Sequence, residues 1–215
     1  MQNTLRISEI FHSLQGEARA AGTPTVFIRL TGCPLRCGYC DTAYAFSGGV
    51  LYQPGEILQE VSLWGCNHVC VTGGEPLAQP ECIALLKQLC DAGYQVSLET
   101  SCAIDVSAVD LRVSKVMDLK TPGSGELDRN RYANLAHITP HDQLKFVLCD
   151  AADYEWAKQQ LSTMKLNELT SDIWFSPVYE QLPAPLLADW ILRDRLPVRM
   201  QIQLHKLLWA DARGK

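Results

Sequence analysis

The sequence has few of the features that mark membrane, secreted or nucleic-acid-binding proteins. No apolar stretch approaches the roughly 20 residues that a membrane-spanning helix needs. The N-terminal stretch MQNTLRISEIFHSLQGE lacks the basic and then apolar regions of a signal peptide. The 19 basic residues are outnumbered by 24 acidic ones, and the net charge of −5 argues against a nonspecific nucleic-acid binder. We therefore expect a cytoplasmic protein that binds neither membranes nor nucleic acid.

Cysteine, in contrast, is abundant, with nine residues in a chain of 215. The odd number and the missing secretion signal disfavour a disulfide framework. In a reducing cytosol, clustered cysteines are usually metal ligands and scattered ones are small core residues. Cys33, Cys37 and Cys40 form such a cluster in TGCPLRCGYC, and the others are expected to be buried hydrophobic residues. These others are Cys66, Cys70, Cys82, Cys90, Cys102 and Cys149.

Apolar runs bounded by turn residues recur along the chain and predict strands. They cover residues 25–30, 68–73, 94–100, 113–120, 143–149, 172–178 and 199–205. Segments with helical spacing lie between several of them, at 54–64, 79–93, 152–164 and 184–194. This alternation predicts an α/β fold with a mostly parallel sheet. The connection 101–112 looks too short for a full helix, which favours an incomplete (partial) βα barrel over a closed one. No linker divides the chain, so we expect a single domain over residues 1–215.

The cysteine cluster directly follows the predicted strand 25–30, which places it at a carboxyl edge, where ligands bind in such folds. Clustered thiolates suit either zinc or an iron–sulfur cluster. A structural zinc site needs a fourth ligand, for which His12 or His68 would be candidates. An iron–sulfur cluster held by three cysteines would instead keep one iron open. The spacing alone leaves both possibilities.

Two motifs then resemble those of the radical S-adenosylmethionine (SAM) enzymes. The spacing C-x-x-x-C-x-x-C, with Tyr39 before the last cysteine, resembles the signature of that superfamily, and VTGGEP at 71–76 resembles its second motif. The resemblance implies a [4Fe–4S] cluster on the three cysteines, with SAM bound to the open iron through its amino and carboxylate groups. One electron passed to the sulfonium would then give methionine and a 5′-deoxyadenosyl radical. Glu75 in the second motif could accept from the methionine ammonium or cap the following helix.

The block EIFHSLQGEARAAGTPTVFIRLTGCPLRCGYCDTAY more narrowly resembles the 7-carboxy-7-deazaguanine synthase family. Further matches are LET, MDLKTPGSG, LKFVL, FSPVYE and QLHKLLW, so the resemblance covers nearly the whole chain. It implies a carbon–nitrogen lyase that converts 6-carboxy-5,6,7,8-tetrahydropterin to 7-carboxy-7-deazaguanine with loss of ammonia, on the route to 7-deazapurines such as queuosine. It also implies Mg²⁺, a flavodoxin-like or other one-electron donor, and a homodimer.

The resemblance assigns site residues position by position, and no side chain is assigned as catalytic, because the radical is carried by the cofactor. The positions that match substrate contacts are Leu14, Gln15, Gly16, Arg29, Thr72 and His205. Thr42 matches the residue whose hydroxyl meets Mg²⁺. The positions that match SAM contacts are Tyr39, Asp41, Gly74, Asp118, Leu119, Lys120, Ser176, Pro177, Val178 and Tyr179.

Several of these residue types also have purely structural interpretations. Gly16 could form a turn, Thr42 or Asp41 could cap a helix, and His205 on the predicted strand 199–205 could be a satisfied core histidine. Arg29 favours the functional interpretation, because a planar guanidinium suits a carboxylate and a merely solvated arginine is disfavoured on a buried strand.

Two other functions compete with that of a 7-carboxy-7-deazaguanine synthase. A glycyl-radical activating enzyme is also small and built on C-x-x-x-C-x-x-C, but it acts on a partner protein and has no need of a carboxylate pocket. A noncatalytic zinc or iron–sulfur binding module would have no use for TGGEP at a neighbouring strand end. Arg29 and the LQGE stretch favour the small substrate.

Overall fold

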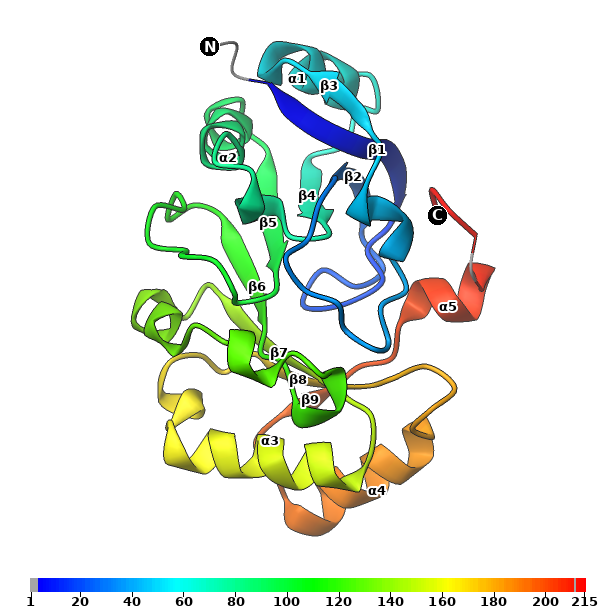
Figure 1. Cartoon of the computed structure of the whole chain (residues 1–215), viewed down its shortest axis with the longest axis vertical. Coiled ribbons are helices and arrows are strands. Elements are labelled where there is room, and N and C mark those ends of the chain that lie inside the picture. The colour runs from blue at the N-terminus through cyan, green and yellow to red at the C-terminus, as the bar shows by residue number, and fades with distance from the viewer. Residues whose placement is uncertain (1–3, 211) are drawn as a thin grey trace.

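A nine-stranded sheet runs through the computed structural model, which describes residues 4–210 and 212–215 (Figure 1). The strands are β1 (Leu5–Leu14), β2 (Pro24–Leu30), β3 (Val50–Tyr52), β4 (His68–Gly73), β5 (Gln95–Thr100), β6 (Ser114–Asp118), β7 (Gln143–Leu148), β8 (Ile173–Pro177) and β9 (Arg199–Met200). The α-helices are α1 (Pro54–Ser62), α2 (Cys82–Asp91), α3 (Ala151–Thr163), α4 (Ala184–Asp194) and α5 (Leu204–Trp209). Short 3-10 helices are η1 (Ala43–Phe46), η2 (Pro76–Ala78), η3 (Pro122–Ser124), η4 (Leu127–Arg129), η5 (Tyr132–His137) and η6 (Leu166–Glu168).

The sheet is open and mostly parallel, with the order β3-β1-β2-β4-β5-β6-β7-β8-β9. Only β1 runs antiparallel to its neighbours β2 and β3 among the strands described. From β2 through β9 every pairing is parallel. Helices α1 and α2 lie over one half of the sheet, and α3 and α4 over the other (Figure 1). The predicted partial βα barrel with a mostly parallel sheet is therefore confirmed.

Side chains alternate between a core outside the sheet and a cavity inside it. On β2, Val26, Ile28 and Leu30 pack in the core together with residues of α1 and α2, whereas Phe27 and Arg29 line the cavity. Successive side chains of a strand point to opposite faces, so a strand buried on both faces can still send polar groups inward. The same alternation continues through β7 and places the functional side chains on one concave face.

The sequence predicted six of the strands within two residues of their ends and all four of the long helices. The strand predicted at 199–205 is wrong beyond Met200, since the chain leaves the sheet there and His205 lies in α5. The strand β1 was not predicted. Many of its residues are only half-buried, because β1 lies at the antiparallel end of the sheet, so it lacks the continuous apolar run typical of central strands. No helix of the described chain is long and apolar enough to cross a bilayer.

A buried ion pair within the outer core gives a stability prediction. The Lys115 ammonium lies 2.9 Å from the Asp142 carboxylate, and both side chains are at most 2% exposed. Asp142 also accepts from the backbone N–H of Lys115 at 2.8 Å. Replacing Lys115 with methionine leaves a buried carboxylate without its counter-ion, so we expect a loss of about 3 to 5 kcal/mol in the free energy of unfolding.

Urea denaturation of the Lys115→Met variant measures this loss. Lys87→Met is the matched control, because the Lys87–Asp91 pair is exposed and such pairs contribute about 1 kcal/mol or less. If the two variants lose the same free energy, the buried pair has no special role in stability.

Candidate active site

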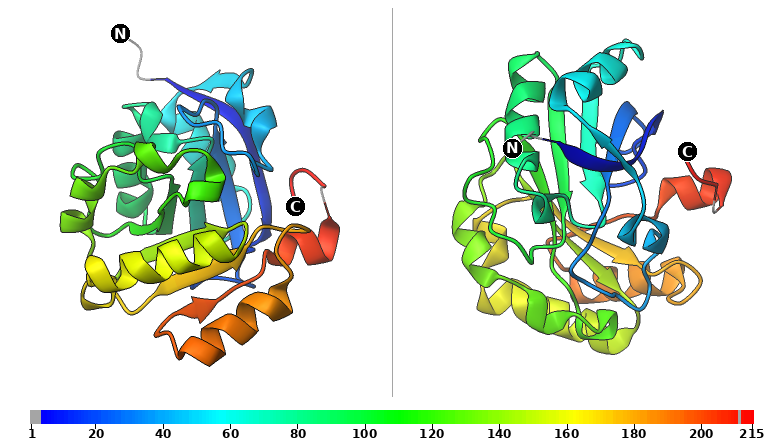
Figure 2. Two further views of the ribbon diagram at one scale, coloured as in Figure 1. Left: turned by 60° about the horizontal axis from the view of Figure 1, so that its bottom comes forward. Right: turned by 45° about the horizontal axis from the view of Figure 1, so that its top comes forward.

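A cavity of about 480 Å³ opens on the inner face of the sheet, at the carboxyl ends of the parallel strands. This is within the usual size range of small-molecule sites. The strands β2, β4, β5, β6 and β7 contribute its walls, together with the loop that carries the three cysteines. In both views of Figure 2, α5 lies beside the β1–β2 side of the sheet, where the Leu204 N–H donates to the Gly16 carbonyl at 3.1 Å.

The cysteine loop, residues 31–42, is held in place by backbone hydrogen bonds on both sides. Gly32 N–H donates to the Ala45 carbonyl at 2.8 Å, and the Gly32 carbonyl accepts from Glu75 N–H at 2.8 Å. On the opposite side, Gly38 N–H donates to the Ser124 carbonyl at 3.0 Å. Gly32 has a φ of +99°, in the region that favours glycine, which lets the chain turn as it leaves β2. The loop is therefore ordered by its neighbours before any ligand is considered.

Cys33, Cys37 and Cys40 all line the cavity as free, partly exposed thiols. Among the described residues, no three His, Cys, Asp or Glu side chains converge closely enough to hold a single metal ion. His12 and His68, the candidate fourth ligands of a zinc site, do not line this cavity. Burial raises the pKa of the Cys33 and Cys37 thiols, and binding to iron would deprotonate them. Three thiols around one cavity suit a cluster that they would hold with one iron left open to a small ligand.

The second motif, VTGGEP at 71–76, packs against the cysteine loop. Glu75 is fully buried and its carboxylate accepts from Leu77 N–H at 3.0 Å, capping η2, and from Ser101 N–H at 2.7 Å. Its capping role is confirmed, and the carboxylate does not line the cavity. Gly74 packs directly on the cysteine loop, since a Cβ atom there would overlap the Gly32 carbonyl oxygen and lie 2.6 Å from Cys33 Cβ. Glycine is thus required for this close approach.

Arg29 projects from β2 into the cavity near the mouth formed by β1. Its Nε donates to Glu9 Oε1 at 2.7 Å, and the Tyr44 hydroxyl donates to the same oxygen at 2.7 Å. The guanidinium carbon lies 5.8 Å from the Phe11 ring centre and 5.9 Å from the Tyr44 ring centre. These contacts engage the Nε edge of the guanidinium fork of Arg29, which also lines the cavity.

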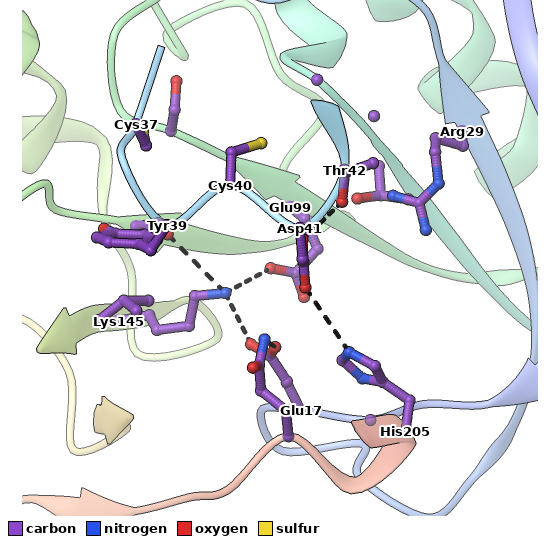
Figure 3. Close-up of a pocket in the computed structure, with 18 of the residues that line it drawn as sticks. Glu17, Arg29, Cys37, Tyr39, Cys40, Asp41, Thr42, Glu99, Lys145 and His205 are labelled. Atoms are coloured by element: carbon purple, nitrogen blue, oxygen red, sulfur yellow. Dashed lines mark hydrogen bonds and ion pairs between the residues drawn. The ribbon is translucent and has the colours of Figure 1, made fainter. Parts of the chain in front are cut away.

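Asp41, Thr42 and His205 lie close together in the cavity wall (Figure 3). The Thr42 hydroxyl donates to Asp41 Oδ1 at 2.8 Å, and His205 Nε2 lies 3.9 Å from Asp41 Oδ2. Thr42 occupies the N-cap position of η1, but its side chain makes no capping hydrogen bond. Burial alone would raise the pKa of Asp41, yet His205, Thr42 and Lys206 hold it well below its usual value. This acidic corner therefore stays ionised at neutral pH.

The structure brings most of the predicted site residues to one cavity. Those that line it are Leu14, Gln15, Gly16, Arg29, Cys33, Cys37, Tyr39, Cys40, Asp41, Thr42, Thr72, Gly74, Asp118, Lys120, Val178, Tyr179 and His205. Leu119, Ser176 and Pro177 do not line it. The Leu119 side chain packs in the outer core, because it alternates with Asp118 and Lys120, and Ser176 is only 1% exposed. These three residues therefore contribute no side chain to the cavity, and their contacts with SAM stay a prediction.

Sequence reasoning missed a charged group at the floor of the cavity. Lys145 of β7 extends between Glu17, which follows the LQG stretch, and Glu99 of β5 (Figure 3). The Lys145 ammonium lies 2.8 Å from Glu17 Oε2 and 3.6 Å from Glu99 Oε2. The sequence does contain a signal for this group, because each of the apolar runs LKFVL and SLET includes one charged residue. A charged side chain on a buried strand needs a partner.

Comparisons with known proteins show the family of this chain. Residues 27–120 match the family profile described as the Radical SAM superfamily. The chain is 47% identical over 214 residues to the 7-carboxy-7-deazaguanine synthase of Chlorobaculum tepidum, covering 98% of this chain and 97% of that protein. It is 41% identical to the synthase of the same name from Koribacter versatilis, covering 95% of this chain and 97% of that one. The chain belongs to the 7-carboxy-7-deazaguanine synthase family.

The fold of the family is also seen in a solved structure. The crystal structure of QueE from Escherichia coli superimposes with a TM-score of 0.73 at 22% identity, covering 94% of this chain and 95% of that one. As a member of the 7-carboxy-7-deazaguanine synthase family, the chain is a radical SAM enzyme and a lyase. Membership implies a [4Fe–4S] cluster and SAM as cofactors.

Proposed function

We propose that this enzyme converts 6-carboxy-5,6,7,8-tetrahydropterin to 7-carboxy-7-deazaguanine with loss of ammonia. The observation that carries the proposal is that the three-cysteine loop and Arg29 face the same cavity, whose size suits a small molecule. A cavity of this kind favours a small carboxylated substrate over a partner protein, and two relatives that align over nearly their whole length carry the name of this synthase.

Cys33, Cys37 and Cys40 would hold the cluster, and Tyr39, Asp41, Gly74, Asp118, Lys120, Val178 and Tyr179 line the part of the cavity assigned to SAM. When bound, the cluster and SAM supply a one-electron reduction and an adenosyl radical that removes the hydrogen at C6 of the substrate. The protein's part is to orient the reacting groups and to exclude water. Gly74 contributes by letting the second motif approach the cysteine loop without a side chain between them.

The substrate would bind beside the first turn of α5. Leu14, Gln15 and Gly16 would lie against the ring, with carbonyl oxygens that keep a second lone pair for its donors, and Thr72 lies across the cavity. A side chain at position 16 would overlap the His205 ring, so Gly16 keeps this histidine close to the ring-binding stretch. Arg29 would bind the substrate carboxylate through the nitrogens that Glu9 does not hold.

Mg²⁺ would be held at Thr42. The hydroxyl donates its proton to Asp41, so its lone pairs remain for a cation. Mg²⁺ keeps several water ligands and needs few protein oxygens, which is consistent with a single partly exposed hydroxyl beside an ionised carboxylate.

Further partners of the proposed enzyme follow from its chemistry and from the family resemblance. A flavodoxin-like or other one-electron donor would reduce the cluster, and two copies of the chain would form a homodimer in the cytoplasm. Leu207 and Leu208 of α5 are about half exposed, at 61% and 49%, and apolar side chains of this kind suit a surface covered by a second copy. Light scattering of the purified protein measures the oligomeric state.

An anaerobic assay tests the proposed function. The protein is reconstituted with iron and sulfide and incubated with SAM, Mg²⁺, a one-electron reductant and 6-carboxy-5,6,7,8-tetrahydropterin. The expected products are 7-carboxy-7-deazaguanine and ammonia, with SAM not consumed. Absence of the deazapurine from a preparation with a full cluster and bound SAM would contradict the proposal.

Arg29 gives a quantitative test of the substrate assignment. We expect Arg29→Lys to raise the KM for the carboxypterin by about 10-fold, because lysine cannot match the planar fork that binds a carboxylate. The affinity for SAM should be unchanged, because the fork lies on the substrate side of the cavity. Arg112→Lys is the control, since Arg112 lies in an exposed cluster with Asp110 and Asp91. An equal loss of SAM affinity in Arg29→Lys would contradict a substrate-specific role.

A further inference from the structure

The cavity floor carries a buried lysine surrounded by carboxylates from three separate elements. The Lys145 ammonium of β7 lies 2.8 Å from Glu17, 3.6 Å from Glu99 and 4.0 Å from Asp118. These acids come from the β1–β2 loop, from β5 and from β6. Burying an ammonium is costly unless it is paired, so this arrangement organises charge at the floor.

The three carboxylates are not equally satisfied. Glu17 accepts from Lys145 and from the side-chain amides of Gln201 and Gln203, at 3.3 and 3.0 Å. Asp118 is paired with Lys120 at 2.9 Å. Glu99, within the described part of the chain, has Lys145 at 3.6 Å as its ion-pair partner, and its carboxylate lines the cavity. Asp118 Oδ1 has no hydrogen-bond partner but is fully buried, so Glu99, whose side chain is 19% exposed, offers the more accessible acceptor to a ligand.

Strand register places Glu99 opposite the carboxylate-binding end of the site. Arg29 of β2 pairs with Thr72 of β4, and Val71 pairs with Leu98, so Glu99 follows in the same row on β5. Two strand spacings, roughly 10 Å, separate the guanidinium strand from the carboxylate strand. One end of the cavity thus presents the Arg29 guanidinium, which is paired with Glu9, and the other presents an excess of carboxylates around Lys145. A carboxypterin has the complementary polarity, with a carboxylate at one end and the 2-amino and ring N–H donors at the other.

We propose that Lys145 is a positioning residue that fixes Glu17 as an anchor and presents Glu99 as the acceptor of the two N–H donors of the substrate ring. This inference rests on the proposed function for the identity of the ring. Glu17 joins the loop after β1 to the floor, which keeps Gln15 and Gly16 against the same ring. Glu99 then selects a 2-amino ring over a 2-oxo ring, because a carboxylate accepts hydrogen bonds from the amino group and repels a carbonyl oxygen.

The arrangement also sets a pH dependence. Burial raises the pKa of Glu99 to about 7, Glu17 and Asp118 add to the rise, and Lys145 opposes it. Two further charged groups act on these acids. Lys120 pairs with Asp118, and His205 acts electrostatically on Glu17. Since only ionised Glu99 accepts from both donors, affinity for the ring should increase as pH rises through about 7. Removing the Lys145 charge would move that midpoint upward, because an ammonium nearby favours the ionised carboxylate.

Direct binding to the cluster-loaded enzyme tests the proposal without turnover. The probes are 6-carboxypterin and its 2-oxo counterpart 6-carboxylumazine, both fluorescent, and the ionisation of each free ligand is measured separately. We expect the wild-type protein to prefer the pterin by about 10- to 100-fold. Glu99→Gln should reduce this preference to about 3-fold or less and remove the pH midpoint, because glutamine offers both a donor and an acceptor and does not titrate.

Three further variants separate positioning from general damage. Lys145→Met should move the pH midpoint upward by about 1 to 3 pH units, and Lys145→Arg should restore it. Lys87→Met, at an exposed ion pair, should behave as wild type. Thermal unfolding and the response of the cluster spectrum to SAM show that each variant is folded. If Lys145→Met does not fold, Glu99→Gln and Lys145→Arg still decide the question.

Results that overturn this inference can be distinguished from results that overturn the proposed function. Full pterin preference in Glu99→Gln, an unmoved midpoint in Lys145→Met, or no binding of 6-carboxypterin to the wild type would each overturn the inference. Product formation with unchanged preference in Glu99→Gln would remove the inference alone. Preference that depends on Glu99 without any turnover of the reduced carboxypterin would remove the proposed reaction and support the recognition of a carboxylated 2-amino ring.

Discussion

Replacing Cys33, Cys37 or Cys40 singly with alanine is expected to remove the iron–sulfur cluster and to lower turnover by more than about a thousand-fold. The three thiols line the cavity together on one short loop. Because the radical originates from the bound cofactors, the remaining side chains have no alternative route to the chemistry. Iron and sulfide content per chain and the anaerobic product assay measure the two losses.

Cys66→Ser is the matched control for these variants. Cys66 is partly buried, its Sγ lies 3.0 Å from the Pro24 carbonyl oxygen, and a serine hydroxyl can keep this hydrogen bond. We expect full iron content and normal turnover. A variant of Cys33, Cys37 or Cys40 that kept four irons and wild-type turnover would contradict the assignment of the cluster to these residues.

Gly74→Ala should have the next largest effect, on both the cluster and SAM. The added methyl group would overlap the Gly32 carbonyl oxygen and lie 2.6 Å from Cys33 Cβ, so the cysteine loop would have to move. Overpacking of this kind costs about 1 to 3 kcal/mol, and here the strain acts directly on a cluster ligand. We expect SAM affinity to fall by about 100-fold and the cluster to be lost faster in air.

Gly55→Ala gives the comparison for this substitution. Gly55 lies in the first turn of α1, and a Cβ atom there meets no other atom within 4 Å. Alanine at such a site restricts the unfolded chain and should leave the protein as stable or slightly more stable. SAM binding is measured by the change in the cluster spectrum and by calorimetry. Equal behaviour of the two alanine variants would show that Gly74 has no steric role.

The central strands could be predicted from the sequence because their burial on both faces produces continuous apolar runs. The predicted run 68–73 coincides with β4, and the predicted run 143–149 is one residue longer than β7. β1 could not be predicted in this way, since its residues are mostly half-buried and its pairing is antiparallel. The segment after Met200 was mistaken for a strand because a short apolar run fits a strand and a helix equally well.

In the candidate site, too, some features could be predicted from the sequence and others required the structure. The cysteine loop and the TGGEP motif are each contiguous in sequence, so they could be recognised before the fold was known, and the pair of motifs favoured an iron–sulfur cluster where spacing alone also allowed zinc. The resemblance predicts that His205 lies near the substrate carboxylate, and its place on α5 against Gly16 required the structure. Leu119 was predicted as a cofactor contact with its neighbours, and strand alternation sends its side chain to the opposite face.

The sequence by itself determined the donor chemistry of this protein, because metal-ligating thiols on one short loop and glycines in one turn act through local geometry. Only the tertiary structure decided which charges share the cavity floor. Lys145, Glu17 and Glu99 are far apart in sequence and meet because of strand register and the path of the β1–β2 loop. A single charged residue inside an apolar run does not show which face it occupies or which partner lies opposite, since both depend on how the whole sheet is assembled.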